Sequence, residues 1–231
     1  SIWNDAPSFL PDFKLIIPNL PGTGNSSLPK ETPALEKLAE SLKLVLDEEG
    51  HSSVIMVGHS MGGYTMLAFA EAYPHMVGHM VMFHSSSFAD NEEKKEARRK
   101  SIAFIRENGS EAFMKTSTPG LFYDEEKSKS DIDRVLKIAS AFDPAMLVYY
   151  YEAMINRKDR TNILEEFKGK VLFIIGQHDK AVPFNVSMKQ VVVPQQPEVR
   201  ILRHTGHMGM LEERERAWKY LSSFIREASV K

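Results

Sequence analysis

Residues 58–62, GHSMG, fit the pattern G-x-S-x-G, with Ser60 at its centre. The apolar run 54–57 before it predicts a strand, and the apolar segment 64–73 after it predicts a helix. A serine on so sharp a turn needs a strained backbone, and we expect the two glycines of the motif to prevent collisions with the strand and the helix. The pattern indicates a nucleophilic serine hydroxyl, with helix N–H groups facing an oxyanion.

A serine hydroxyl becomes a nucleophile when a base takes its proton and a third group orients that base. Asp179 lies in the loop after the apolar run 171–175, and His207 lies in the loop after the run 199–202. The carboxyl ends of parallel strands meet at one edge of a sheet, where sites of this architecture lie. The chain order Ser60, Asp179, His207 therefore predicts a Ser-Asp-His triad.

Other histidines and acids could take these roles. We expect His204, at the strand end, to be buried or bonded to the backbone, whereas His207 should lie on an exposed loop. His178 could also act as a base or a ligand. No carboxylate is placed to complete a metal shell with His204 and His207, so we expect no metal. Weaker alternatives to Asp179, because they follow no predicted strand, are Asp124, Asp143 and Asp159.

Five short apolar runs alternate with helix-like segments, which predicts an α/β protein with a mostly parallel sheet flanked by helices. Thr32 and Pro33 should begin one helix, and Gly50 should end it. The last helix is indicated by an apolar stripe of Trp218, Leu221 and Ile225. The predicted strands are 13–17, 54–57, 79–83, 171–175 and 199–202.

The segment 85–162 breaks the alternation, because it is charged, helix-like and without a good strand run. We expect it to be a helical cap inserted into a core formed by residues 1–84 and 163–231.

Composition excludes several classes of protein. The 231 residues include no Cys, which rules out disulfides and thiolate chemistry. Lys+Arg 29 against Asp+Glu 31 gives a net charge of −2, so we expect no nucleic-acid partner. No run is apolar enough to span a membrane. We expect a cytoplasmic monomer or homodimer that acts on a small molecule without a cofactor.

The motifs together resemble the α/β-hydrolase family, in the branch with a helical cap. GHSMGG is similar to its nucleophile elbow, LIIPNLPGTGNSS to a strand and loop with Asn19 where Asp is usual, GQHDKAVP to its acid loop and TGHMGMLEE to its histidine loop. The resemblance implies the α/β-hydrolase fold, with Ser60 as nucleophile, Asp179 as acid and His207 as base. It also implies that the backbone N–H of Met61 is one oxyanion donor.

Family members carry a strand hairpin and a further strand with a His-Gly loop before a segment like SIWNDAPSFL. By this resemblance we expect a further N-terminal segment to hold the second oxyanion donor. Its strand would lie between the runs 13–17 and 54–57.

We expect the pocket between the carboxyl edge of the sheet and the cap. The function predicted is that of a carboxylesterase-like serine hydrolase for a small, hydrophobic acyl substrate; the alternative is a ligand-binding or signalling protein with little turnover. The candidate substrate-binding residues are His59, Phe83, Phe122, Tyr123, Met146 and Tyr150.

Overall fold

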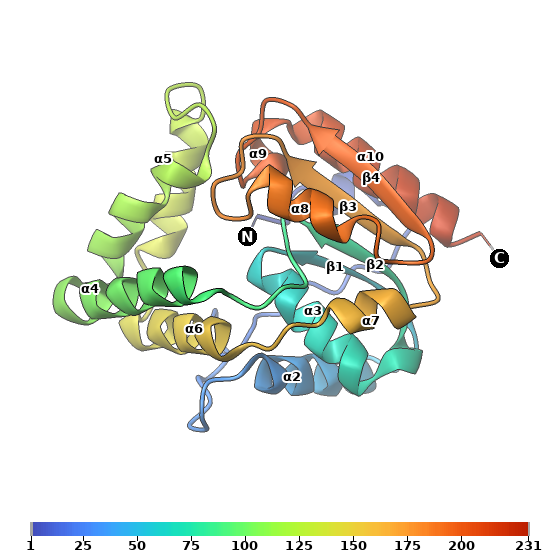
Figure 1. Ribbon diagram of the computed structural model, residues 1–231, viewed down its shortest axis with the longest axis horizontal. Coiled ribbons are helices and arrows are strands. Elements are labelled where there is room, and N and C mark those ends of the chain that lie inside the picture. Colours follow the sequence, from blue (N-terminus) through green and yellow to red (C-terminus); the bar gives the residue numbers. More distant parts are fainter. Residues whose placement is uncertain (1, 231) are drawn as a thin grey trace.

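A parallel four-stranded sheet, in the order β1-β2-β3-β4, forms the centre of the protein (Figure 1). The computed structural model describes residues 2–230. The strands are β1 (Val54–His59), β2 (Val77–Phe83), β3 (Val171–Gly176) and β4 (Pro197–Leu202). Four of the five predicted strands are thus confirmed, and so is the α/β class.

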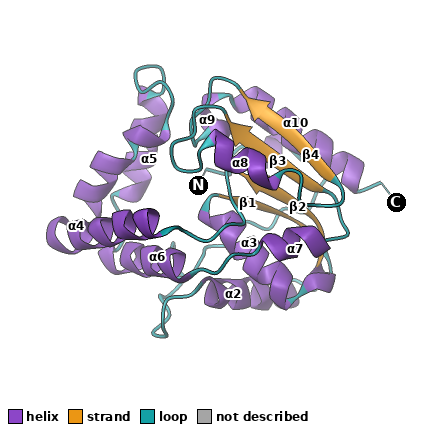
Figure 2. Ribbon diagram, in the orientation of Figure 1, coloured by secondary structure: helices purple, strands orange, loops and turns teal. Residues whose placement is uncertain are grey.

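Helices connect the strands and cover both faces of the sheet (Figure 2). The longest of them, α4, is broken by Gly109, whose φ is +82°. The helices are α1 (Ala6–Phe9), α2 (Leu35–Glu48), α3 (Met61–Ala72), α4 (Glu92–Ser117), α5 (Lys129–Ala139), α6 (Pro144–Asn156), α7 (Thr161–Glu166), α8 (Phe184–Gln190), α9 (Gly209–Glu212) and α10 (Arg214–Ala228), with short 3-10 helices η1 (Pro74–Met76) and η2 (Pro119–Leu121).

The core has two parts, one on each face of the sheet. Along β2, Met80 and Met82 belong to one hydrophobic cluster, and Val81 and Phe83 belong to the other. Successive side chains of a strand point to opposite faces, so the sheet separates the two clusters. The first cluster includes α2, α3 and α6, and the second includes α9 and α10. The parallel strands therefore bring all their carboxyl ends to one edge, between two layers of helices.

The expected strand at 13–17 is wrong. This segment forms no strand, and in the described part of the chain β1 is the edge of the sheet. Its side chains still pack alternately, Phe13 and Leu15 on one cluster and Ile16 on the other. Within residues 2–230 no strand pairs with this segment, so its N–H and C=O groups form no ladder there.

The helix expected from Thr32 begins later than its sequence signal. Its N-cap is Ala34, in an extended conformation, and helix α2 starts at Leu35, which is fully buried. The expected end at Gly50 is confirmed, since Gly50 has φ +71° and its N–H donates to the carbonyl of Asp47. In α10 the expected stripe is confirmed, because all three of its apolar residues are buried.

The helices α4, α5 and α6 stand together beside the sheet, at the left of Figure 1. They occupy most of the segment 85–162, and α7 runs across its expected end at residue 162. None of the helices described between residues 2 and 230 is long and apolar enough to cross a membrane.

Candidate active site

Ser60 lies between β1 and α3 in a strained backbone conformation, with φ 51° and ψ −119°. The end of β2 holds it there: its N–H donates to the carbonyl of Phe83 at 3.0 Å, and its carbonyl accepts from the hydroxyl of Ser85 at 2.7 Å. A residue other than glycine keeps a positive φ only when its surroundings impose it. The next residue, Met61, begins α3, so its N–H has no partner within the helix and is free for an oxyanion.

Of the two glycines of the motif, only Gly58 acts as the sequence suggested. A Cβ on Gly58 would lie 2.5 Å from Cα of Gly63, which confirms the expected collision on the strand side. A Cβ on Gly62 would meet nothing within 4 Å, so the collision expected there is wrong. The second tight position is Gly63, where a Cβ would lie 2.2 Å from Oγ of Ser85. Gly63 thus lies close to Ser85, the residue whose hydroxyl holds Ser60. Neither Gly63 nor Ser85 belongs to the motif.

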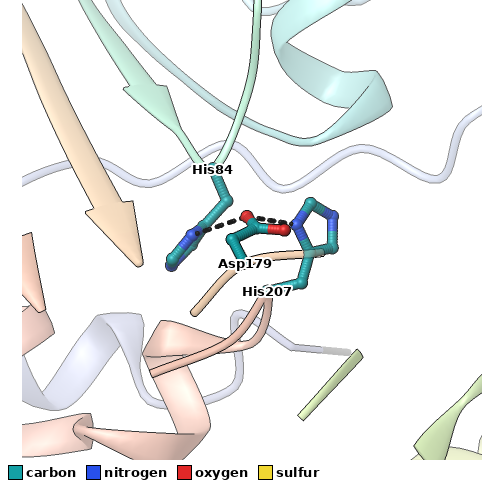
Figure 3. A group of neighbouring side chains, drawn as sticks. All are labelled: His84, Asp179 and His207. Atoms are coloured by element: carbon teal, nitrogen blue, oxygen red, sulfur yellow. Dashed lines mark hydrogen bonds and ion pairs between the residues drawn. The ribbon is translucent and has the colours of Figure 1, made fainter. Parts of the chain in front are cut away.

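The carboxylate of Asp179, after β3, is held by four hydrogen bonds. Its Oδ1 accepts from the backbone N–H groups of Ala181 and Val182, both at 2.8 Å. Its Oδ2 lies 2.8 Å from Nδ1 of His207 and 3.2 Å from Nδ1 of His84 (Figure 3). Burial works to raise the pKa of Asp179, but the hydrogen bonds from the two histidines outweigh it and hold the pKa well below its usual range. The carboxyl is therefore ionised at neutral pH.

His207 is buried, with 3% of its surface exposed, whereas His204 is exposed. The expectation that His207 lies on an exposed loop is therefore wrong. So is the expectation that His204 is buried or bonded to the backbone, because its only described hydrogen bond runs from its own N–H to the Glu213 carboxylate. Two hydrogen bonds hold the backbone of His207. Its N–H donates to the carbonyl of Leu121 at 2.7 Å, and its carbonyl accepts from Nε2 of His59 at 2.8 Å. The backbone of His207 is therefore held by η2 through Leu121 and by the end of β1 through His59.

Glu212, at the end of α9, fixes the loop that carries His207. Its carboxylate accepts the backbone N–H groups of Gly206 and Met208, which flank His207, at 3.0 Å. It also accepts the N–H of Tyr123, after η2, at 2.7 Å. Burial raises the pKa of this carboxyl, against the lowering effect of the three N–H donors. The histidine loop and the segment after α4 are thus joined through one side chain.

The structure brings Asp179 and His207 together as predicted. With Nδ1 of His207 engaged by Asp179, Nε2 is left to act as a base. The rings of His59 and His207 lie 4.8 Å apart, and His59 directly precedes Ser60. Between residues 2 and 230 no hydrogen bond joins the Ser60 hydroxyl to His207. Such bonds are commonly long in enzymes without substrate and tighten when it binds.

The alternative residues have other partners. His178 stacks on the ring of Tyr123, with 3.8 Å between ring centroids. Asp143 caps α6 through the N–H of Ala145. Asp159 accepts the N–H of Thr161, and Asp124 pairs with Lys127. None of these acids is bonded to a histidine.

The six expected substrate-binding residues differ in their surroundings. Phe83, Phe122 and Met146 are almost fully buried in the two core clusters, and Tyr123 is exposed. The hydroxyl of Tyr150 donates to the carbonyl of Pro21 at 2.7 Å. His59 is half-buried, and burial lowers its pKa well below the usual value, so its ring is neutral at pH 7. A cavity of about 400 Å³ between the loop 18–27 and α2 touches none of these six. Their contact with substrate stays a prediction.

Within residues 2–230, the only group of three side chains that could hold a metal ion is His84, Asp179 and His207. Their separations of 2.8 and 3.2 Å are those of hydrogen bonds between ring nitrogens and a carboxylate, which accounts for the group without an ion.

Sequence reasoning missed two residues at this site, His84 and Glu212. His84 follows a strand directly, as Ser60 does, and a polar residue at a strand end was the signal that could have found it. Glu212 carries no such signal, because its importance comes from backbone groups on two separate loops.

Comparison with known proteins agrees with this architecture. Residues 2–214 match the family model described as alpha/beta hydrolase fold. A 2-hydroxy-6-oxononadienedioate/2-hydroxy-6-oxononatrienedioate hydrolase from Burkholderia vietnamiensis is 24% identical, over 93% of this chain and 77% of its own. A thermophilic esterase from Thermogutta terrifontis has the same fold, with a TM-score of 0.92, 23% identity and coverage of 99% and 86%. The enol-lactonase from Burkholderia xenovorans gives a TM-score of 0.88, with 19% identity and coverage of 97% and 86%.

The chain belongs to the α/β-hydrolase fold family. The family resemblance of the sequence and the expected fold are thereby confirmed.

Proposed function

We propose that this protein is a serine hydrolase that cleaves a small, hydrophobic carboxylic ester through an acyl-enzyme on Ser60. One observation carries the proposal: Ser60 is held at φ 51° at the start of α3, on the sheet edge where Asp179 and His207 form a buried hydrogen-bonded pair. Backbone strain that presents a hydroxyl beside an oriented imidazole is typical of a nucleophile and its base.

In the proposed reaction, Oγ of Ser60 attacks the ester carbonyl carbon while Nε2 of His207 takes the hydroxyl proton. The carbonyl oxygen becomes an oxyanion, which the N–H of Met61 stabilises. Collapse breaks the bond to the alcohol, which leaves with the proton from His207. Water then gives its proton to His207 and attacks the acyl-enzyme, releasing the acid and restoring Ser60. Asp179 holds the proton of His207 on Nδ1 in the resting enzyme.

The proposed cap, residues 85–162, would supply the apolar side of the pocket. The relatives support ester-like substrates, since they include an esterase and an enol-lactonase. The Burkholderia vietnamiensis relative widens the choice to the compounds in its name. A substrate panel therefore includes short-chain and aromatic esters, an enol-lactone and 2-hydroxy-6-oxononadienedioate.

The test is labelling by a fluorophosphonate probe, followed by intact-protein mass. The wild type should gain the mass of one phosphonyl group, and Ser60→Ala should gain none. Ser53→Ala, at an exposed serine just before β1, is the matched control and should be labelled like the wild type. Failure of the folded wild type to react would contradict the proposal, as would equal labelling of Ser60→Ala.

The alternative function is that of a ligand-binding or signalling protein of this fold with little turnover. The substrate panel separates the two. Hydrolysis of any member that disappears in Ser60→Ala supports the enzyme, whereas tight binding of an ester without turnover supports the alternative.

A further inference from the structure

His84 directly follows β2 and shares a rare feature with Ser60. In residues 2–230 these are the two residues other than glycine with a positive φ, at 47° and 51°. The side chain of His84 is fully buried. A histidine in this conformation is strained, and such strain persists where the surrounding structure imposes it.

The space around the ring is built for it. A Cβ on Gly176 would lie 2.8 Å from Cε1 of His84, and a Cβ on Gly209 would lie 2.5 Å from Nε2. Nε2 is buried and has no hydrogen-bond partner among the described residues. Two glycines, one at the end of β3 and one at the start of α9, thus make room for an imidazole whose polar contacts are all at Nδ1.

Nδ1 of His84 lies 3.2 Å from Oδ2 of Asp179, and the N–H of Gly176 lies 3.2 Å from the same nitrogen. The ring nitrogen can donate to the carboxylate or accept from the amide, but it cannot do both with one proton. Because Asp179 is ionised, an N–H pointed at its negative charge is favoured over an amide hydrogen bond to a neutral ring. The proton therefore belongs on Nδ1.

Oδ2 of Asp179 then receives two imidazole N–H groups, one from His84 and one from His207. Figure 3 shows the carboxylate between the two rings. A carboxylate oxygen that already has one donor stabilises a neighbouring imidazolium less than an unshared oxygen does. The second donor also fixes the carboxylate in its rotamer.

We propose that His84 is a positioning residue, which holds Oδ2 of Asp179 with its Nδ1–H and so tempers the basicity of His207. The effect of His84 on the kinetics rests on the proposed function, whereas the position of the proton on the His84 ring does not. Other titratable groups around the cluster are His59 from β1, Lys94 from α4 and Glu212 from α9, and the variants below leave all three unchanged.

The test compares His84→Leu with His84→Asn in the pH dependence of the fluorophosphonate labelling rate. Leu removes the donor, so Asp179 should stabilise the imidazolium of His207 better. The acidic limb of the profile of labelling rate against pH should therefore move up by about half to one pH unit. At a fixed pH below the limb, labelling should slow by about threefold to tenfold. Asn tolerates positive φ and offers an amide N–H near the place of Nδ1, so its limb should stay close to that of the wild type.

His204→Leu is the matched control, because His204 is exposed on the same loop as His207, and its limb should not move. An unshifted limb in folded His84→Leu, or an equal shift in His84→Asn, would overturn the proposal. A merely structural role would lower the Tm of both variants without moving the limb.

A measurement on the wild type covers the case in which His84→Leu does not fold. The ¹⁵N chemical shifts of the His84 ring should report a protonated Nδ1 and an unprotonated Nε2, with the Nδ1 proton shifted far downfield. A proton on Nε2 would refute the shared carboxylate. The NMR result also stands if the wild type takes up no probe, an outcome that would contradict the proposed function alone.

Discussion

Replacing Asp179 by Asn exchanges one carboxylate oxygen for an NH₂ group, and the structure decides which oxygen is lost. Oδ1 accepts the N–H groups of Ala181 and Val182 at 2.8 Å, so the amide oxygen of Asn must stay in that position. The NH₂ group then takes the place of Oδ2 and points a donor at Nδ1 of His207. Two donors cannot face each other, so the proton of His207 moves to Nε2.

This change puts a proton on the atom that should receive one from Ser60. The same tautomer error in serine proteases lowers kcat by about 10⁴-fold. We expect a loss of that size in kcat/KM, equivalent to about 5 kcal/mol of transition-state stabilisation. KM should change little, because Asp179 is buried and Asn has nearly the same size and shape.

The assay is hydrolysis of the best ester from the panel, with unfolding curves to show that the variant is folded. Asp143→Asn is the matched control, since Asp143 caps α6 and Asn caps a helix equally well. If Asp179→Asn retains more than about a tenth of the wild-type kcat/KM, the proposed role of Asp179 is wrong. A large loss of kcat/KM in Asp143→Asn would show that the role had been assigned to the wrong acid.

Three further outcomes follow from described contacts. Gly63→Ala should lower the free energy of unfolding in urea by about 2–3 kcal/mol, because its Cβ meets Ser85, whereas Gly62→Ala should raise it by up to about 1 kcal/mol. Glu212→Gln should lower Tm and kcat/KM together, since an amide has one acceptor oxygen for three N–H groups. Asp179 has a lowered pKa, so it stabilises the fold at neutral pH; acid titration below about pH 5 should destabilise the wild type more than Asp179→Asn.

Most of the fold could be predicted because each of the four paired strands contains a short, mainly apolar run between helical segments. The run 13–17 shows the limit of this signal. Its residues pack on both core clusters as strand residues do, but a strand also needs a neighbour within hydrogen-bonding reach. An apolar run indicates that a segment packs in the core, but it does not indicate whether a second strand lies beside that segment.

Asp179 and His207 could be predicted as a pair because each follows a strand of one parallel sheet. The role proposed for His84 could not be, since it depends on room left by Gly176 and Gly209, which lie about a hundred residues away along the chain. The motif around Ser60 likewise gives the spacing of its glycines, whereas the tight contact of Gly63 is with Ser85.

The contacts between the histidine loop and η2 limit how this protein could be re-engineered. His207 donates its N–H to Leu121, and the Glu212 carboxylate joins Gly206 to Tyr123. Residues 85–162 are therefore no interchangeable module: a chimera that exchanged the whole segment would also replace the scaffold on which the imidazole rests. A chimera could instead leave residues 119–123 in the recipient core and exchange only the helices α4, α5 and α6. The contacts that hold the loop of His207 would then be kept.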